Sequence, residues 1–595
     1  MPSPFARYLS LALLAFALIL PYAVTNHTYP IPTFYAEFTA LALYLLVGAG
    51  VLFLVNSARP RIPYASPVVS LVPLAFGLLL VAQTFLLPVA QPSMNWLGAG
   101  FLLAAFLAVH AGYGFARAGL SEDALRWAAG ALIVGALFAV FSQLVQLFHA
   151  EVRFSPFVVA YNITVERRPF GNMAQANHLA TVIAFGMAGA MFLAQTRRLN
   201  LLVWASVSAI CAVGQALTVS RGPWLQTAVI VVAGFWMAAA ESRRHGGARR
   251  NTREWLIPFA LAVIFLAVNV AVRWANVHYH LDLAVSAADR FKDQGQIAPR
   301  IALWKYGLTM FKSHPLLGVG WGEFPRFQFA FAKALGGVEI ANNSHDIFID
   351  LLAKSGLIGL GILLIGLLAW LVRVLVAPQC APRVFGLALI GVLLMHALVE
   401  YPQQYMFFLL PAMFVFGLLE SRPLRFVPGG LSLGIQVVLV VGGLAALYPI
   451  LRDYQRAEVL YYGARPAEEY RADPSFLFGA WGEYGMATLL PIDRNDLPVK
   501  LAMHKQAIAL LPGETVLRRY AVLQALDGQQ SAAFDTVDRL KIFAEELHDW
   551  PSQLASLYAL SDEQQAVLAG FKAELVKKYG VPPKDANQDE DDSDD

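Results

Sequence analysis

Long apolar stretches alternate with short polar segments through the first 450 residues of the chain. Most of these stretches run for about 17 to 25 residues, the length that an α-helix needs to cross a hydrocarbon core of about 30 Å. The pattern predicts an all-α, polytopic membrane helix bundle of about thirteen spans. We place the spans at 8–23, 37–55, 67–88, 96–115, 127–148, 173–195, 200–217, 223–240, 255–273, 347–376, 384–398, 404–420 and 430–450.

Composition supports a membrane protein. Charged residues make up 14% of the chain, whereas a soluble domain carries about 25%. The two cysteines, Cys211 and Cys380, are too few for a disulfide framework or a cysteine-based zinc site. The net charge of +3 averages opposite ends of the chain and therefore gives no indication about nucleic acid; we expect no nucleic acid partner.

Arginines are distributed unevenly between the predicted loops. With the N-terminus placed inside, the inner loops and their flanks carry sixteen arginines and the short outer loops carry four. Basic residues are retained on the cytoplasmic side of a membrane, so the pattern predicts a cytoplasmic N-terminus. Thirteen spans then place the C-terminal region on the outer side.

The spacing of apolar and polar segments also predicts the domain organisation. We expect an N-terminal bundle over 1–273, a large outer loop over 274–345, further membrane helices over 346–450, a soluble helical domain over 451–583 and a disordered acidic tail over 584–595. Within the soluble domain, apolar residues recur at helical spacing on both sides of Pro512-Gly513. This helix–turn–helix pattern is similar to tetratricopeptide-type repeats.

The unusual polar residues of the chain gather at the outer ends of the predicted spans. Ionisable groups inside a membrane cost about 2.5–3.5 kcal/mol each at mid-helix and usually serve function. Structural explanations exist for individual members: interfacial arginines can extend to the membrane surface, and Arg221 can cap a tight turn. The set consists of His27, Glu37, Arg167, Arg168, Asn172, Gln175, Asn177, His178, Ser220, Arg221, Arg300, His345, Asp346, His396, Glu400 and Tyr405.

The chemistry of this set suits an anionic, lipid-linked substrate. Arginines bind a diphosphate through paired, charge-assisted hydrogen bonds. A neutral histidine can accept a proton from a hydroxyl near pH 7. The outer loops contain no Asp-x-Asp motif or acidic pair that demands a divalent ion, so we expect no metal and no cofactor.

Several ordered motifs resemble a known family. They are Arg300-Ile-Ala-Leu-Trp304, His314-Pro315-Leu-Leu-Gly318-Val-Gly320, Asn343-Ser344-His345-Asp346 and Gly356-Leu-Ile-Gly359. Together they resemble the domain shared by bacterial O-antigen ligases, O-antigen polymerases and O-oligosaccharyltransferases, here at about 200–420. The ligase pattern is His, then an amide or hydroxyl residue, nine residues and Gly-x-x-Gly. Asp346 departs from this pattern, which leaves the role of its side chain open.

Other segments are similar to the PglL-type protein O-oligosaccharyltransferases of Gram-negative bacteria. These are His27 to Glu37, Arg168 to Asn177, Thr218 to Arg221 and His396 to Tyr405. The resemblance implies a GT-C-like bundle in the inner membrane, with the outer loop and C-terminal domain in the periplasm. It also implies that an oligosaccharide moves en bloc from undecaprenyl diphosphate to Ser or Thr of a periplasmic acceptor such as pilin, by inversion and without a metal.

The resemblance assigns roles to the outer residues. His345 is the candidate catalytic base, and Arg168, Arg221 and Arg300 are the candidate diphosphate ligands. The candidates for orienting acceptor or glycan are His27, Glu37, Gln175, Asn177, Asp346, His396, Glu400 and Tyr405.

Two other enzyme classes share this donor chemistry, and two non-enzymatic classes predict a different pattern of polar residues. An O-antigen ligase uses lipid A-core as acceptor, and a polymerase uses a second lipid-linked glycan. A transporter or flippase for lipid-linked sugars would place polar residues through the depth of the bundle, and a structural scaffold would not need the arginine and histidine cluster.

Overall fold

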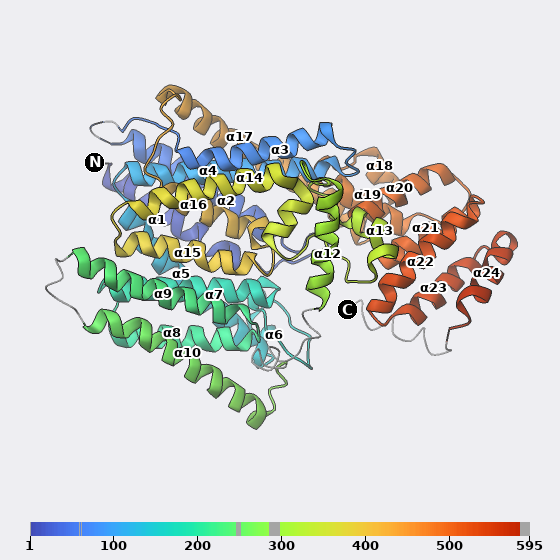
Figure 1. Cartoon of the computed structure of the whole chain (residues 1–595), viewed down its shortest axis with the longest axis horizontal. Helices are drawn as coiled ribbons and strands as arrows, with labels where there is room; N and C mark the ends of the chain where they lie inside the picture. Colours follow the sequence, from blue (N-terminus) through green and yellow to red (C-terminus); the bar gives the residue numbers. More distant parts are fainter. Residues whose placement is uncertain (1, 59, 61, 245–251, 285–297, 583–595) are drawn as a thin grey trace. The chain divides into compact units, whose positions relative to one another are not determined.

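The computed structural model describes residues 2–58, 60, 62–244, 252–284 and 298–582. Within these ranges every regular element is helical, as Figure 1 shows, and the only strand-like features are two isolated bridges. This confirms the predicted all-α class. The predicted acidic tail at 584–595, part of the outer loop at 285–297 and four inner arginines (59, 61, 249 and 250) lie outside the described residues.

Each of the thirteen predicted spans corresponds to an apolar helix in the described ranges. Ten helical segments are long and apolar enough to cross a membrane, and α8, α15 and α16 are shorter apolar helices. The chain is therefore a polytopic membrane protein. The helices are α1 (Pro4–Ala17), α2 (Phe34–Asn56), α3 (Leu71–Leu86), α4 (Pro92–Arg117), α5 (Ser121–Leu147), α7 (Ala176–Gln195), α8 (Leu201–Leu217), α9 (Gly222–Arg244), α10 (Thr252–Tyr279), α14 (Ile347–Val376), α15 (Ala381–Ala397), α16 (Met406–Leu419) and α17 (Gly429–Tyr461).

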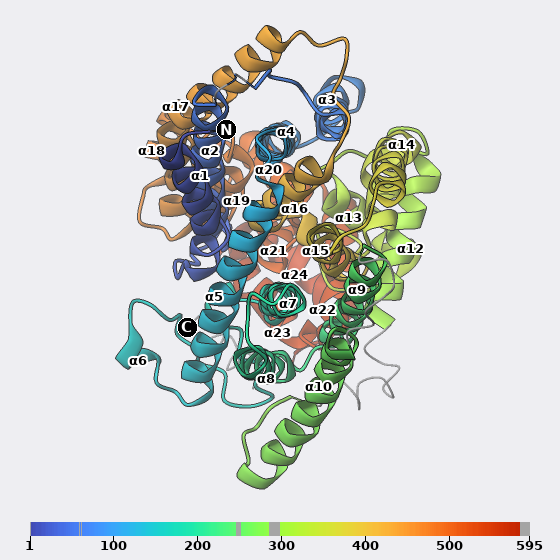
Figure 2. The same ribbon diagram turned by 90° about the vertical axis from the view of Figure 1, so that its left-hand side faces the viewer.

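The chain forms two compact units, and the first comprises residues 1–76, 100–295 and 362–448. Helix α7 lies in the middle of this unit, packed against α5, α8, α9 and α15 (Figure 2). Small residues permit this close packing, since a Cβ added at Gly189 would lie 2.8 Å from the Ala129 carbonyl oxygen of α5. Helix α7 is thereby held among four other helices.

The second unit comprises residues 77–99, 296–361 and 449–595. It contains α12 (Ala298–Ser313), α13 (Phe324–Leu335) and the first part of α14. Its C-terminal helices are α18 (Ala467–Ala472), α19 (Gly479–Leu489), α20 (Leu497–Leu510), α21 (Glu514–Leu526), α22 (Gln530–Glu546), α23 (Trp550–Asp562) and α24 (Gln565–Tyr579). From α19 onward each helix packs against the next, and the break predicted at Pro512-Gly513 falls between α20 and α21.

Candidate functional site

The predicted site residues fall into two groups, one in each unit. The second unit holds Arg300, His345 and Asp346. The first unit holds His27, Glu37, Arg168, Gln175, Asn177, Arg221, His396, Glu400 and Tyr405.

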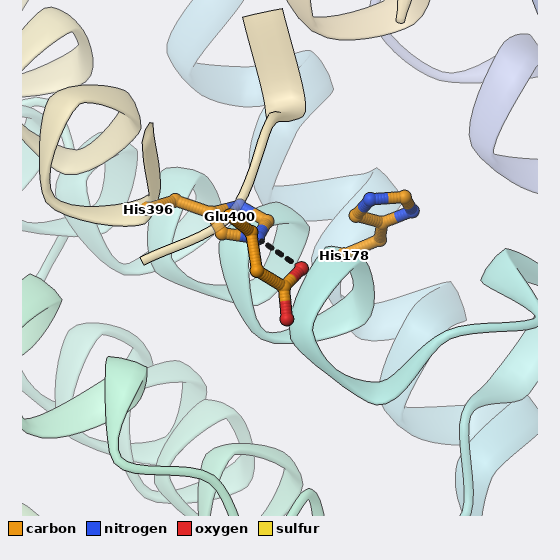
Figure 3. A group of neighbouring side chains, drawn as sticks. All are labelled: His178, His396 and Glu400. Atoms are coloured by element: carbon orange, nitrogen blue, oxygen red, sulfur yellow. Dashed lines mark hydrogen bonds and ion pairs between the residues drawn. The ribbon is translucent and has the colours of Figure 1, made fainter. Parts of the chain in front are cut away.

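Glu400 is the centre of a buried hydrogen-bond network in the first unit. It lies in the turn after α15, where its Oε2 is 3.1 Å from His396 Nε2 (Figure 3) and accepts a hydrogen bond from Gln175 Nε2 at 3.1 Å. Its Oε1 accepts from Asn177 Nδ2. The other nitrogen of the His396 ring, Nδ1, lies 2.8 Å from Thr181 Oγ1. The network therefore joins the start of α7 to the end of α15.

The network continues to Arg168 through two side chains. Asn177 Oδ1 accepts from the Ser220 hydroxyl, which in turn accepts from Arg168 Nη2 at 3.1 Å. Arg168 Nε donates to the Thr218 carbonyl oxygen at 3.1 Å, and its backbone N–H donates to the Tyr161 hydroxyl at 2.7 Å. These contacts fix the guanidinium at the α8–α9 turn.

The charge at Glu400 follows from these contacts. Burial acts to raise the pKa of the Glu400 carboxyl, but the hydrogen bond and charge of His396, together with Asn177, outweigh it and hold the pKa at about 2. The group is thus a buried carboxylate with partners on both oxygens, the arrangement that makes a buried charge tolerable.

His178 completes this cluster. Its ring lies 4.6 Å from the ring of Tyr405 and 5.7 Å from that of His396, and its buried Nδ1 has no hydrogen-bond partner among the described residues. Possible ligand atoms of His178, His396 and Glu400 lie within 4.8 Å of one another, a donor set that zinc accepts. An ion would have to replace the His396–Glu400 hydrogen bond, because zinc takes its ligands at about 2.0–2.2 Å. The contacts of His396 and Glu400 therefore favour a hydrogen-bond network over a metal centre.

His27 and Glu37 hold the surrounding segments together. The two ring nitrogens of His27 lie 3.0 Å from the Pro32 carbonyl oxygen and 2.8 Å from that of Asn172. Glu37 accepts from the Thr33 hydroxyl at 2.6 Å and from the Met406 N–H at 3.5 Å, at the start of α16. Both contacts tie the first outer segment to the rest of the unit.

Tyr405 ends the η5 turn (Pro402–Gln404) and precedes α16. Burial, with Tyr401 alongside, raises the pKa of the Tyr405 phenol well above its ordinary value. Its hydroxyl is therefore a neutral donor. Arg167, by contrast, caps a helix, since its Nη2 donates to the carbonyl oxygens of Gln146 and Leu147 at 3.0 and 2.8 Å.

A cavity of about 160 Å³ opens beside Ser220, within the first unit. Apolar side chains supply most of its wall, and Asn269, Arg273 and Asn276 supply polar groups from one face of α10. The opposite wall includes Ser220 and Pro223, the residues on either side of Arg221-Gly222. The cavity therefore combines an apolar lining with nearby guanidinium groups.

In the second unit, Asp346 caps α14. Its Oδ1 accepts from the N–H groups of Phe348 and Ile349, both at 2.9 Å, as an N-cap side chain does. His345 precedes it with a left-handed backbone (φ 56°). The His345 side chain is 21% exposed, with Nε2 4.0 Å from Glu339 Oε1, so the imidazole is accessible to a substrate.

The glycines of the ligase-like motif allow two backbone segments to touch. Helix α14 is interrupted at Gly356, where φ is 61° and ψ −161°. There the Leu357 N–H donates to the Pro315 carbonyl oxygen at 2.9 Å, and the Val319 N–H donates to that of Ala353 at 2.8 Å. A Cβ on Gly356 would lie within 3 Å of Gly318 N. The motif therefore shapes the helix that begins beside His345.

Arg300 lies two turns before Gly307 on α12, and residues seven apart share one face of a helix. A Cβ on Gly307 would lie 3.4 Å from Ser344 Cβ. Arg300 is therefore on the side of α12 that faces the His345 segment.

Three residues that the sequence did not single out also belong to this geometry. Gln226 Nε2 donates to Thr181 Oγ1 at 2.8 Å, and Arg273 lines the cavity beside Ser220. Thr181 follows Asn177 by four residues, and Glu400 follows His396 by four. This spacing places Asn177 and Thr181 on one face of α7. Glu400 lies in the turn after α15, where its N–H donates to the His396 carbonyl oxygen at 2.9 Å. The four-residue spacing was the available sequence signal.

Known protein families match three parts of the chain. Residues 206–364 match the O-antigen ligase family, residues 169–194 match the protein glycosylation ligase family, and residues 384–556 match the C-terminal region of a membrane-bound polymerase described as a virulence factor. The fold, the motifs and these matches support a membrane glycosyltransferase of the O-antigen ligase superfamily.

Two curated relatives narrow the class. The chain is 24% identical over 461 residues to a general O-oligosaccharyltransferase of Acinetobacter baylyi, covering 76% of this chain and 77% of the relative. It is 24% identical over 264 residues to a ComP-specific O-oligosaccharyltransferase of the same organism, covering 43% and 45%. These matches support a PglL-type O-oligosaccharyltransferase, as the sequence predicted.

Proposed function

We propose that the chain transfers a preassembled oligosaccharide en bloc from undecaprenyl diphosphate to a Ser or Thr hydroxyl of a periplasmic protein such as pilin. The observation that carries this proposal is the cavity beside Ser220, with Arg168 bound to that serine and Arg273 in its wall. The polar side of this cavity offers donors for a diphosphate, and its apolar side offers a surface that the start of a polyprenyl chain can contact. The names of the relatives, which describe O-oligosaccharyltransferases, support the reaction class.

The reaction consists of one substitution at the anomeric carbon. The neutral imidazole of His345 accepts the proton of the acceptor hydroxyl, and the oxygen attacks the carbon with inversion. The bond from the sugar to the phosphate oxygen breaks, and undecaprenyl diphosphate leaves with the electron pair. Arginine side chains stabilise the charge that develops on the leaving group. Arg168, Arg221 and Arg300 are the candidates that the resemblance assigns to this role.

In the same proposal the chain lies in the inner membrane, with its N-terminus in the cytoplasm. His345, the outer arginines and the C-terminal helices then face the periplasm, where flipped donor and exported acceptor meet. Fusions after Ala118 and after Tyr461 test this topology with two reporter enzymes, one that is active only in the cytoplasm and one that is active only in the periplasm. The cytoplasmic reporter is expected to be active after Ala118, and the periplasmic reporter after Tyr461.

Transfer by the purified protein tests the proposal directly. Detergent-solubilised protein, a glycan on undecaprenyl diphosphate and a pilin acceptor are expected to yield glycosylated pilin. In a cell that lacks the gene, unglycosylated pilin would agree with this result. Rough lipopolysaccharide would identify a ligase, and single-repeat chains would identify a polymerase, in line with the two other family matches.

Replacement of Arg221 by Lys is expected to lower kcat/KM for the donor by at least about tenfold. Lysine keeps the charge but loses the planar pair of donors that binds a phosphate through two hydrogen bonds. One charge-assisted hydrogen bond contributes about 1.5–3 kcal/mol. Donor titrations measure the effect, and full activity of the variant would show that charge alone is sufficient.

Removal of divalent ions is expected to leave transfer unchanged. The carboxylate of Glu400 and both ring nitrogens of His396 already have side-chain partners. Dialysis against a chelator, followed by elemental analysis and the transfer assay, tests this. A loss of activity that zinc or magnesium restores would contradict the metal-independent mechanism.

A further inference from the structure

The segment that leads to His345 lies on the C-terminal helices, within the second unit. Helix α13 packs against α20 and α22, as Figure 1 shows. Its Ala332 and Phe329 share a hydrophobic cluster with Ala507 of α20 and with Leu540 and Phe543 of α22. The surface of α13 that the cluster covers is thus supplied by residues more than 150 positions further along the chain.

Arg539 of α22 binds α13 directly. Its Nη1 donates to the carbonyl oxygens of Phe329 and Ala330 at 2.5 and 2.8 Å, and its guanidinium carbon lies 5.0 Å from the centre of the Phe329 ring. Its Nε donates to Asp535 Oδ2 at 2.9 Å, and Lys333 of α13 pairs with the same carboxylate. The Arg539 guanidinium therefore donates hydrogen bonds both to α13 and to its own helix, α22.

The chain beyond α13 also touches α22. A Cβ on Gly337 would lie 2.5 Å from the Ile542 carbonyl oxygen, so this position accepts only glycine without a shift. The preceding residue, Gly336, has φ 88° and accepts a hydrogen bond from the Tyr306 hydroxyl at 2.7 Å. The path of the chain is thus fixed from α12 on one side and α22 on the other.

The buried amide of Gln328 carries this constraint toward His345. Its Nε2 donates to the Glu339 carbonyl oxygen at 2.7 Å, and its Oε1 accepts from the Ala341 N–H at 3.0 Å. Glu339 is the residue whose carboxylate lies 4.0 Å from His345 Nε2. Ile340, which lies between Glu339 and Ala341 in the sequence, packs in the hydrophobic cluster that includes residues of α20 and α22.

We propose that the C-terminal helices α20 and α22 are part of the transfer centre, and that Arg539 is a positioning residue that holds α13 and, through Gln328, the segment before His345. The C-terminal domain then sets the rate of the chemical step in addition to any contact with the acceptor. The kinetic part of this proposal rests on the proposed glycan transfer.

Arg539→Met tests the proposal, because methionine keeps much of the apolar stem and removes all the donors. The matched control is Lys541→Met on the same helix, since Lys541 contacts Glu545, Trp550 and Tyr579 of the C-terminal domain alone in the interactions that the structure describes. Arg539→Lys is the conservative variant, and Gly337→Ala perturbs the same contact from the opposite side.

Hydrogen–deuterium exchange of the full chain in detergent gives a readout that does not depend on activity. Exchange of peptides within 336–346 is expected to accelerate in Arg539→Met and Gly337→Ala, and to stay unchanged in Lys541→Met. In the transfer assay, kcat is expected to fall by about tenfold to a hundredfold, as misplaced catalytic groups cause. KM for the acceptor is expected to stay unchanged, and Arg539→Lys to recover part of the rate.

Unchanged exchange in Arg539→Met would overturn the proposal, and so would a rise in acceptor KM alone, which identifies a recruitment domain. Failure of the wild-type protein to transfer glycan would overturn the proposed function and leave the exchange result as the measure of the structural link. The two failures are therefore distinguishable.

Discussion

Replacement of His345 by Ala is expected to reduce glycan transfer by about 10²–10⁴-fold, the contribution of a positioned general base. The imidazole is partly exposed and lies 4.0 Å from the carboxylate of Glu339. The rest of its segment is engaged in backbone contacts, with the His345 N–H donating to Asn343 Oδ1 at 3.2 Å. These backbone contacts therefore hold a partly exposed imidazole in place.

The backbone of His345 complicates a simple alanine experiment. Its φ of 56° lies in the left-handed region, which alanine enters at a cost of about 1–2 kcal/mol and which Asn enters more readily. His345→Ala thus changes both the base and the local backbone. His345→Asn retains the tolerated backbone and removes the base, so it isolates the chemical contribution.

Both variants are expected to lose transfer activity by about 10²–10⁴-fold, with His345→Asn the more stable of the two in a thermal unfolding assay in detergent. Single-turnover transfer measures the chemical step. Near-normal transfer by His345→Asn would show that the position requires a left-handed backbone and no base. Loss of donor binding, measured separately, would assign His345 to the substrate contacts instead.

Much of this arrangement could be predicted from the sequence, because hydrophobic length and short motifs encode it locally. Apolar runs of membrane-spanning length located all thirteen apolar helices. The spacing of His345 and Gly356 was recognisable because it matches a family motif, whereas the interruption of α14 at Gly356 was not predicted. These features depend on residues that are neighbours in the chain.

The network around Glu400 could not be predicted in the same way. Its contacts join residues more than 200 positions apart, such as Gln175 and Glu400. Apolar runs indicate that helices exist but do not indicate which of them are neighbours. For the same reason, the sequence did not predict that residues 77–99 group with the C-terminal helices. Asp346 departs from the family pattern, and its carboxylate caps the start of α14 by accepting hydrogen bonds from the N–H groups of Phe348 and Ile349.

Glu400→Gln is expected to lower both the stability of the protein and its affinity for the donor. Three donors, on Gln175, Asn177 and His396, face the carboxylate. An amide offers a single acceptor oxygen and turns its own NH₂ toward one of those donors. An unsatisfied buried donor costs about 1–3 kcal/mol, so a lower unfolding temperature should accompany the change.

The effect on the donor follows from the orientation of Asn177. Because its NH₂ group faces Glu400, its Oδ1 faces Ser220, and Ser220 is then able to accept from Arg168. Without the carboxylate, Asn177 Nδ2 loses the charged acceptor that fixes the orientation of its amide. Arg168 is then released from Ser220, and KM for the donor should rise while KM for the acceptor is unchanged.

The Arg373–Glu420 pair in the same unit is the matched control. It is also a buried ion pair, with the Glu420 side chain fully buried, and none of the predicted site residues contacts it in the interactions that the structure describes. Glu420→Gln is therefore expected to lower stability without changing KM for the donor. If both variants change only stability, the Glu400 network supports the fold and has no role in donor binding.

The double variant Asn177→Asp/Glu400→Gln separates orientation from charge at a single position. It moves the carboxylate one step along the network, where the new carboxylate at position 177 can accept from both Ser220 and the new amide at position 400. Arg168 keeps its contact with Ser220 in this arrangement, so donor KM is expected to return toward the wild-type value. A double variant as impaired as Glu400→Gln alone would mean that the carboxylate must stand beside His396, and that the histidine–carboxylate pair rather than the route to Arg168 carries the effect.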